Sequence, residues 1–463
     1  AKRESIEAIL DMAEHKKFGA ARKLVVAGCL VERYRHEILQ EIPEVDFVIG
    51  TNELERVLEA CALDDAPPAG GKDAGGPTGV SGRNQSQARR TFDFPAAPYL
   101  YHEFTPRVLS TPGYSAYLKI AEGCDHPCTF CVIPQMRGRF RSRRFESVVR
   151  EAENLARQGV RELTLIGQDT TSYGHDLGLH DGLATLLREL GKCEGLVWLR
   201  FLYCYPNQLT ESLIAAVAET PTAAKYFDIP LQHASGPVLK AMRRGSNGGQ
   251  FLKMLEKIRR AMPEAALRTS MIVGFPGETD DDFKALTDFV AAAEFDHLGV
   301  FLYSNEETSA SFGLENQVAA RVAVGRQKRL LALQRRISRG KLRRRIGRRY
   351  PVLVEGRSEE TNLLFRGRLE SQAPEIDGRV LINDFEGPEP QPGEFRWATV
   401  TAASDYDLVA RLEAQRFAED VPTDRSTAAP REIPAPQPSG ACSVALGPGP
   451  RLVNIQAVPG APS

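Results

Sequence analysis

The sequence lacks any apolar run near the roughly 18 residues that a bilayer-spanning helix needs, so no membrane span is expected. Its first residues include neither an initiating Met nor the apolar core of a signal peptide. The formal net charge of −1 provides no overall basic field for nucleic acid. Eight cysteines in 463 residues are too few for a disulfide framework. We therefore expect a cytoplasmic protein whose clustered cysteines bind metal.

Three cysteines do cluster, in the run Gly-Cys-Asp-His-Pro-Cys-Thr-Phe-Cys that contains Cys124, Cys128 and Cys131. Thiols at these gaps can surround one small inorganic core from a single loop. A cubane iron–sulfur cluster with three protein ligands keeps one iron open to a small molecule, whereas ferredoxins fill that position with a fourth Cys. The pattern therefore predicts a cluster that does chemistry.

A zinc site is the alternative, with His126 as its fourth ligand. Structural zinc prefers four protein ligands, usually supplied as two separated pairs. His126 stands between two of the cysteines and precedes Pro127, which is poor geometry for closing a tetrahedron on the same ion. No second Cys pair lies nearby in the sequence, so we favour the cluster.

The length suggests about three domains. Apolar residues at helical spacing from Ile6 to Ala13, followed by a short apolar run at 24–27, predict α/β material that is too small for a full domain. A Gly/Pro/Ser-rich stretch predicts a flexible linker, and a Pro/Ala/Ser-rich end predicts disorder. The predicted divisions are 1–63 (incomplete α/β domain), 64–98 (linker or insertion), 99–325 (barrel), 326–349 (basic connecting helix), 350–412 (small β-barrel) and 413–463 (disordered tail).

Six apolar segments alternate with helical ones from Tyr114 onward, which implies a parallel sheet with right-handed crossovers. The candidate strands are 116–121, 162–167, 197–203, 226–230, 267–273 and 298–303, and the candidate helices are 146–158, 182–190, 211–219, 250–261 and 280–293. In barrel-like α/β folds the active site lies beyond the carboxyl ends of the strands. The cysteine loop directly follows the first strand, so we expect it at that end.

A long basic helix is predicted from about Val318 to Arg345, and short strands after it are typical of a small β-barrel. These strands are 351–355, 363–369, 380–382, 396–401 and 408–412. Between residues 350 and 412, twelve acidic side chains stand against six Arg and no Lys. An acidic barrel repels RNA and suits a basic protein partner, so direct RNA binding is the less favoured interpretation.

Polar motifs follow three of the candidate strands. Gly167-Gln168-Asp169 offers a close-approach glycine and two polar side chains that could hold an amino group, although such turns are common. The segment 228–233 ends in His233, for which a buried or capping role is an equal interpretation. The glycines of 272–278 let backbone lie against a flat base, as a plain strand-to-helix turn would also do. The arginines at 137–144 fit a solvated surface, with one or two able to pair with an acidic ligand.

Together, Cys-x3-Cys-x2-Cys, Gly-Gln-Asp and Val-Gly-Phe-Pro-Gly-Glu resemble the radical S-adenosylmethionine (SAM) enzymes, and the order of parts resembles their methylthiotransferase branch. Segments 104–112, 123–143 and 202–206 are similar to the RimO subgroup, and the match extends over roughly residues 1–412 without the linker. The resemblance implies a partial (β/α)6 radical SAM barrel, preceded by an incomplete α/β domain and followed by a TRAM-type β-barrel. RimO enzymes methylthiolate the β-carbon of an aspartate in small-subunit ribosomal protein twelve.

The resemblance also implies cofactors and partners. The three clustered cysteines would hold a 4Fe-4S cluster that binds SAM, and one electron from an external donor would yield a deoxyadenosyl radical that removes hydrogen from the substrate. Gln168 and Asp169 would contact the methionine end of SAM, and the segment around Val273 its adenine. The implied cofactor-binding residues are Phe130, Gly167, Gln168, Asp169, Gln232, Val273 and Gly274. The implied partner is the small-subunit ribosomal protein or the assembled small subunit, with no membrane involved.

The family's amino-terminal domain carries three further cysteines for an auxiliary 4Fe-4S cluster. Here only Cys29 matches that set, and the other two would lie before Ala1. We therefore expect either a fragment of a longer protein or a chain that cannot build the second cluster. As the sequence stands, SAM cleavage is expected to survive while sulfur insertion fails.

Two alternatives remain, one with the same chemistry and one from a different class. A methylthiotransferase acting on a transfer RNA adenosine would share the chemistry, but its terminal barrel should be basic because phosphate contacts dominate such affinity. A non-catalytic relic that binds ribosomal components is supported by the two missing cysteines and opposed by the intact triplet.

Overall fold

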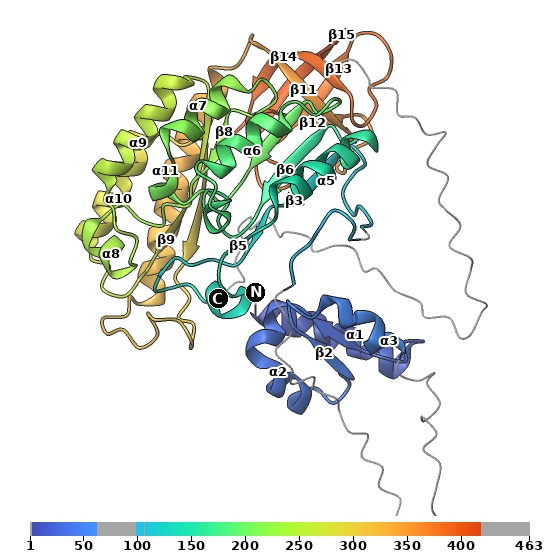
Figure 1. Ribbon diagram of the computed structural model, residues 1–463. Helices are drawn as coiled ribbons and strands as arrows, with labels where there is room; N and C mark the ends of the chain where they lie inside the picture. Colours follow the sequence, from blue (N-terminus) through green and yellow to red (C-terminus); the bar gives the residue numbers. More distant parts are fainter. Residues whose placement is uncertain (1, 63–98, 106, 418–463) are drawn as a thin grey trace, which may run out of the picture. The chain divides into compact units, whose positions relative to one another are not determined.

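The computed structural model describes residues 2–62, 99–105 and 107–417. They form two compact units, an amino-terminal one and a larger one that contains both predicted barrels; the ribbon in Figure 1 is coloured along the sequence. No helix in these described ranges is long and apolar enough to cross a membrane. The predicted linker and nearly all of the predicted tail lie outside the described residues.

The amino-terminal unit is a small α/β structure. Its elements are α1 (Lys2–Phe18), β1 (Val25–Ala27), α2 (Cys29–Glu41), β2 (Phe47–Ile49), the 3-10 turn η1 (Leu54–Arg56) and α3 (Val57–Ala62). The two strands pair in parallel, and apolar side chains from both helices and strands, including Ile9, Val31 and Val48, form its core. The α/β material predicted for this end of the chain is confirmed.

The larger unit is built on six parallel strands, as predicted. They are β3 (Ser115–Lys119), β6 (Glu162–Ile166), β7 (Trp198–Phe201), β8 (Tyr226–Asp228), β9 (Ala266–Val273) and β10 (His297–Leu302). The strands pair in the orders β3-β6-β7 and β8-β9-β10, and a parallel bridge between Leu199 and Ala223 joins the two halves. An open parallel arrangement of this kind is the partial barrel that the alternation of elements predicted.

Amphipathic helices cover the outer side of these strands (Figure 1). The helices are α5 (Phe145–Arg157), α6 (Gly182–Leu190), α7 (Glu211–Glu219), α9 (Gly248–Ala261) and α10 (Asp280–Ala293), all within two residues of the predicted bounds. Short elements were not predicted: β4 (Ala121–Glu122), α4 (Ile133–Arg137), β5 (Arg141–Ser142) and α8 (Gly236–Ala241). They are too short to produce an apolar period, and three of them lie near the predicted site.

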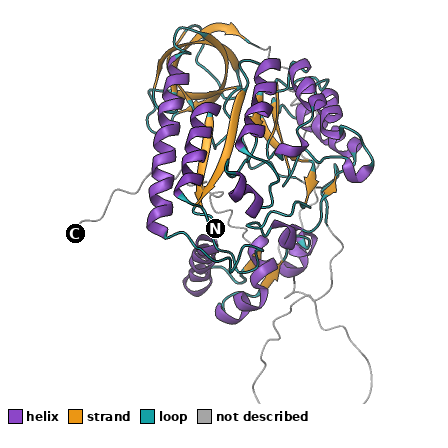
Figure 2. Ribbon diagram, turned by 90° about the vertical axis from the view of Figure 1, so that its left-hand side faces the viewer, coloured by secondary structure: helices purple, strands orange, loops and turns teal. Residues whose placement is uncertain are grey.

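Helix α11 (Ala320–Arg343) connects this sheet to a closed five-stranded barrel. The barrel strands are β11 (Arg349–Arg357), β12 (Phe365–Leu369), β13 (Val380–Phe385), β14 (Phe395–Ala403) and β15 (Leu408–Arg416), in the order β11-β12-β13-β15-β14. Figure 2 shows these strands as a ring at one end of the unit. The tail was expected from residue 413, but β15 runs to Arg416 because its pairing with β14 continues as far as Arg396.

The small barrel packs against the amino ends of the parallel strands. Glu162, at the start of β6, accepts hydrogen bonds from Arg368 of β12 at 2.6 and 3.1 Å. Tyr226, at the start of β8, donates to Asp377 at 2.7 Å. Trp198 meets Phe395 edge to face, with ring centroids 4.8 Å apart. The carboxyl ends of the strands, where the cysteine loop lies, are therefore the end that the small barrel does not cover.

Candidate active site

The loop that carries Cys124, Cys128 and Cys131 begins directly after β4, beyond the carboxyl ends of the parallel strands. All three thiols are partly buried. Between two of them, the amide and hydroxyl of Thr129 donate to carbonyl oxygens at the end of α8, at 3.2 and 2.9 Å. The loop is thus fixed by an element from the other half of the sheet.

A second attachment comes from the neighbouring strand. The amide of Gly123 donates to Oε1 of Gln168, which follows β6, at 2.8 Å. Gly123 has φ +82°, and a Cβ there would lie 2.2 Å from the carbonyl oxygen of Arg139, so only glycine fits this approach. Gln168 therefore positions the start of the cysteine loop.

Burial disfavours the charged form of two of these thiols, Cys124 and Cys131, when no metal is present. It raises the pKa of Cys124 to about 11 and also raises the pKa of Cys131. Thiolates are the metal-binding form, so loading the site must release protons. Three thiols on one fixed, half-buried loop are a donor set that suits an iron–sulfur core.

A stacked column stands beside the cysteines. The His126 ring stacks on Tyr205, with centroids 3.5 Å apart and planes 7° apart, and the Arg244 guanidinium lies 4.4 Å from the Tyr205 centroid. Arg244 also donates to Sγ of Cys128 at 3.5 Å. A cation at this sulfur stabilises its negative charge.

His126 is engaged away from the thiols. Its Nε2 lies 2.6 Å from Oδ2 of Asp169, and its ring is covered by Tyr205. The fourth ligand that the zinc alternative requires is thus occupied by a structural contact.

Asp169 organises its own turn. It is 2% exposed, and its carboxylate accepts from the amide and hydroxyl of Thr171, from Ser172 and from His126. Burial opposes its charge, but the hydrogen bonds outweigh that effect and lower its pKa. Asp169 therefore stays charged, and in this structure it supports the loop through His126. Its predicted contact with SAM stays a prediction.

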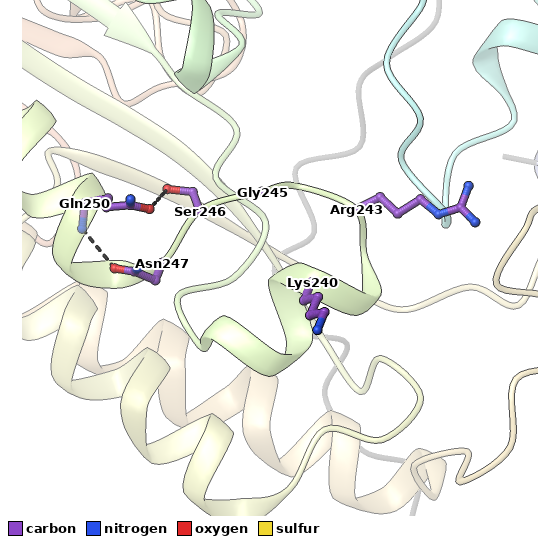
Figure 3. Close-up of a pocket in the computed structure, with 6 residues that line it drawn as sticks. All are labelled: Lys240, Arg243, Gly245, Ser246, Asn247 and Gln250. Atoms are coloured by element: carbon purple, nitrogen blue, oxygen red, sulfur yellow. Dashed lines mark hydrogen bonds between the residues drawn. The ribbon is translucent and has the colours of Figure 1, made fainter.

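Arg244 reaches the cysteines because the backbone turns sharply after α8. Arg243 has φ +54°, and it is exposed while Arg244 is 5% exposed. Figure 3 shows the Arg243 side chain pointing away from Gln250. Arg244 points inward, where it also donates to the carbonyl oxygen of Pro230. The pocket in Figure 3 has a volume of about 460 Å³ and is lined by Lys240, Arg243, Gly245, Ser246, Asn247 and Gln250.

The loop after β9 is held by Glu278. Its carboxylate accepts from the amides of Gly274 and Phe275. Gly274 has φ +81°, and a Cβ there would lie 2.6 Å from Cβ of Ala323, at the start of α11. The glycine thus permits both the turn and the close packing of α11.

His233, for which the sequence left two roles open, is fully buried. Its Nδ1 accepts from the Ser235 amide at 3.0 Å, and its Nε2 lies 3.9 Å from Glu278. Of the two roles left open for His233, these contacts fit the buried one, in which the side chain supports a turn.

The remaining predicted residues lie at or after the ends of strands, or in the cysteine loop itself. Gln232 has φ +73° and forms a parallel bridge with Met271, Val273 is fully buried, and Phe130 packs with Met242 and Phe275. Gly167 directly follows β6, and a Cβ added there would lie 3.5 Å from the carbonyl oxygen of Ala121. These residues therefore gather at the carboxyl end of the sheet, and their contact with a cofactor stays a prediction.

Cys29 belongs to the amino-terminal unit, where it is the first residue of α2 and is partly buried. Sequence reasoning missed Arg244 and Tyr205. Only Tyr205 could have been found from the sequence, because it lies in the Leu-Tyr-Cys-Tyr-Pro segment. That segment contributes to the family resemblance, but no role was predicted for its residues.

Two family models match the chain: the Radical SAM superfamily over residues 118–290 and the TRAM domain over residues 346–412. Two similar curated proteins are both named ribosomal protein uS12 methylthiotransferase RimO. The protein from Solibacter usitatus is 53% identical over 99% of this chain and 88% of its own length. The protein from Koribacter versatilis is 52% identical over 89% of this chain and 86% of its own length. Among solved structures, the radical SAM methyltransferase TsrM from Kitasatospora setae is 18% identical, with a TM-score of 0.49 over 65% of this chain and 59% of that chain.

Proposed function

Because this chain belongs to the RimO family of radical SAM proteins, we propose that it is a methylthiotransferase acting on ribosomal protein uS12. The acceptor is the β-carbon of an aspartate in that protein. The observation that carries the proposal is the fixed loop with Cys124, Cys128 and Cys131 at the open end of the sheet. The partner is the free ribosomal protein or the assembled small subunit, in the cytoplasm.

The three cysteines would hold the 4Fe-4S cluster. When bound, the cluster and SAM supply one-electron cleavage of a carbon–sulfur bond, fed by an external electron donor. The chain's own contribution is to position and shield. Gln168 fixes the start of the loop, and Arg244 places positive charge at Cys128. Glu278 fixes the loop in which the backbone near Val273 is proposed to meet adenine.

The charge of the small barrel supports a protein acceptor over a transfer RNA. Its arginines are largely occupied by its own acids, as in the pairs Arg357–Glu389 and Arg411–Glu386. A barrel neutralised in this way has little positive charge left for phosphate. The transfer RNA alternative is therefore not favoured by this surface.

The auxiliary cluster is a separate matter. Within the 463 residues, Cys29 is matched to the auxiliary set without its two companions, so we propose that this stretch of sequence assembles one cluster rather than two. SAM cleavage would then proceed while sulfur insertion fails.

The test is anaerobic reconstitution with iron, sulfide, dithionite and SAM. Formation of 5′-deoxyadenosine that is abolished by Cys128→Ala supports a radical SAM enzyme, and its absence in the unsubstituted chain supports the relic. A chain extended upstream to include two further cysteines is expected to add mass to a uS12 peptide at aspartate. Modification of transfer RNA and not of uS12 would overturn the choice of substrate.

A further inference from the structure

The outer face of α11 carries an unusual excess of positive charge. Residues 316–354 contain thirteen Arg and Lys and no Asp or Glu, in a chain whose net charge is −1. Nine of these cations lie within α11 itself. Solvated helices ordinarily mix both signs, since opposite charges four residues apart stabilise a helix and like charges destabilise it. A helix whose charged residues are all positive is therefore less stable locally, which indicates that its positive charge serves another purpose.

Most of these cations share one face. Arg326 and Lys341 point inward and pair with Asp280 and Asp296. The exposed cations recur at helical spacing over 23 residues, about 33 Å of helix. They are Arg321, Lys328, Arg329, Arg335, Arg336, Arg339 and Arg343. We name these seven side chains the α11 basic face.

Few carboxylates neutralise this face. Arg335 and Arg339 share a single partner, Asp405, which lies 3.9 Å from Arg335 and accepts a hydrogen bond from Arg339. In the part of the chain that the structure describes, Lys328, Arg336 and Arg343 have no carboxylate within ion-pair distance. A groove of about 800 Å³ between α10 and α11 runs along the face, with Arg329, Arg335, Arg336 and Arg339 in its wall. The face is thus both charged and hollowed.

The position of the face connects it to the site. Ala323, near the start of α11, packs at Gly274 in the loop after β9, and Leu342, near the end of α11, joins the core of the small barrel. Helix α11 runs from the open end of the sheet to the small barrel (Figure 1), and the basic face extends along it. A large partner held at the open end could lie along it.

We propose that the α11 basic face binds the phosphate backbone of RNA that surrounds the acceptor protein. This rests on the proposed function, because a ribosomal protein has ribosomal RNA as its neighbour. Six of the seven cations are Arg, whose planar guanidinium suits phosphate. A membrane surface is not favoured, since the apolar face that such binding requires packs inside the protein through Ala323, Leu330 and Leu342. RNA therefore contacts α11, whereas the acidic barrel next to this helix repels the phosphate backbone.

The experiment measures binding of the full chain to a short fluorescein-labelled hairpin RNA by anisotropy, from about 50 to 200 mM salt. The test variant is Lys328→Gln/Arg336→Gln/Arg343→Gln. The matched control removes three arginines that pair with acids of the small barrel, as Arg357→Gln/Arg379→Gln/Arg411→Gln. Both variants must melt like the unsubstituted chain.

We expect the slope of log affinity against log salt to become less steep by about 0.7–0.9 for each phosphate that the α11 variant no longer neutralises. The control should keep the original slope. Equal decreases in both variants, or binding of polyglutamate or phosphatidylserine vesicles without binding of RNA, would overturn the proposal. Methylthiolation of RNA-free uS12 is measured separately, with the chain extended upstream to include two further cysteines. If it fails while the RNA result holds, the proposed function is wrong and the basic face remains.

Discussion

At the scale of single residues, two adjacent arginines have opposite surroundings. Arg244 is buried against Cys128 and Tyr205, whereas Arg243 is exposed on the other side of the same turn. Hydrogen bonds and positive charge at cluster sulfurs stabilise the reduced state and raise its potential. We therefore predict that Arg244→Gln makes the cluster potential more negative by about 60 mV, one tenfold change for a one-electron couple.

An electron paramagnetic resonance redox titration of the reconstituted chain measures this shift. Arg243→Gln is the matched control, because it removes the same charge one residue away without touching a sulfur. If both substitutions move the potential equally, the effect is one of general charge and Arg244 has no special role.

The two glycines of the loop after β9 offer a second comparison. Gly274 and Gly277 have φ of +81° and +82°, so alanine is strained at either position by about 1–2 kcal/mol. Only at Gly274 would the new Cβ also collide with Ala323, while nothing lies within 4 Å at Gly277. We predict that Gly274→Ala weakens SAM binding about tenfold, or 1.4 kcal/mol, beyond Gly277→Ala.

Isothermal titration with SAM on the reconstituted chain gives both affinities. Equal weakening would mean that backbone strain alone matters and that the packing of α11 against the loop does not reach the cofactor site.

Site residues that lie close together in the sequence could be predicted, whereas site residues that only the fold brings together could not. The spacing of Cys124, Cys128 and Cys131 identifies them because one loop supplies all three thiols. Arg244 lies more than a hundred residues further along the chain, after a short helix with no apolar period. The role of Arg244 depends on the turn at Arg243. There a non-glycine residue adopts a left-handed conformation that the local sequence does not predict.

At the scale of elements, the strands and helices of the sheet were predicted within a few residues because burial on both faces gives long apolar runs. The contact between the two barrels was not predicted. It depends on polar side chains such as Glu162 and Arg368, which look like solvated residues in the sequence but are almost fully buried in the structure.

The Glu162–Arg368 pair supports a prediction about stability. Burial opposes both charges, but Arg368 and Arg200 lower the pKa of Glu162, and Glu162 and Glu355 raise the pKa of Arg368. Breaking a buried pair leaves an uncompensated charge and typically costs about 3–5 kcal/mol. We predict a loss near the lower end, about 3 kcal/mol, for Arg368→Met because Arg200 remains 3.4 Å from Glu162. Urea unfolding at neutral pH measures it, and Glu162→Gln/Arg368→Met should recover part of the loss.

The same pair gives a pH dependence. The pKa of Glu162 is lower in the folded chain, so its stabilisation is complete above the ordinary carboxyl pKa of about 4.3 and is lost as the pH falls below it. We predict that the unsubstituted chain loses stability more steeply below this pH than the Glu162→Gln/Arg368→Met variant. Urea midpoints between neutral and acidic pH would decide, and parallel curves for the two chains would contradict the prediction.

At the scale of the whole molecule, the order of the domains along the chain was predicted, but which end of the sheet each one occupies was not. The larger unit has two ends: the small barrel covers the amino ends of the strands, and the cysteine loop occupies the carboxyl ends. The small barrel is thus fixed to the sheet without covering the cysteine loop. Composition could not reveal this, because which end a domain covers is decided by contacts between segments distant in sequence.

Everything that SAM cleavage requires of the chain is proposed to lie in the larger unit, whereas Cys29 lies in the amino-terminal one. We therefore predict that the 463-residue chain binds about four irons after reconstitution, the content of a single 4Fe-4S cluster. Cys29→Ala should leave the iron content and the yield of 5′-deoxyadenosine unchanged, while Cys124→Ala should remove most of both. Iron and sulfide analysis with Mössbauer spectra distinguishes the cases. An iron content near eight, halved by Cys29→Ala, would mean that Cys29 holds a second cluster with ligands from elsewhere, and that sulfur insertion and SAM cleavage are both within reach of this sequence.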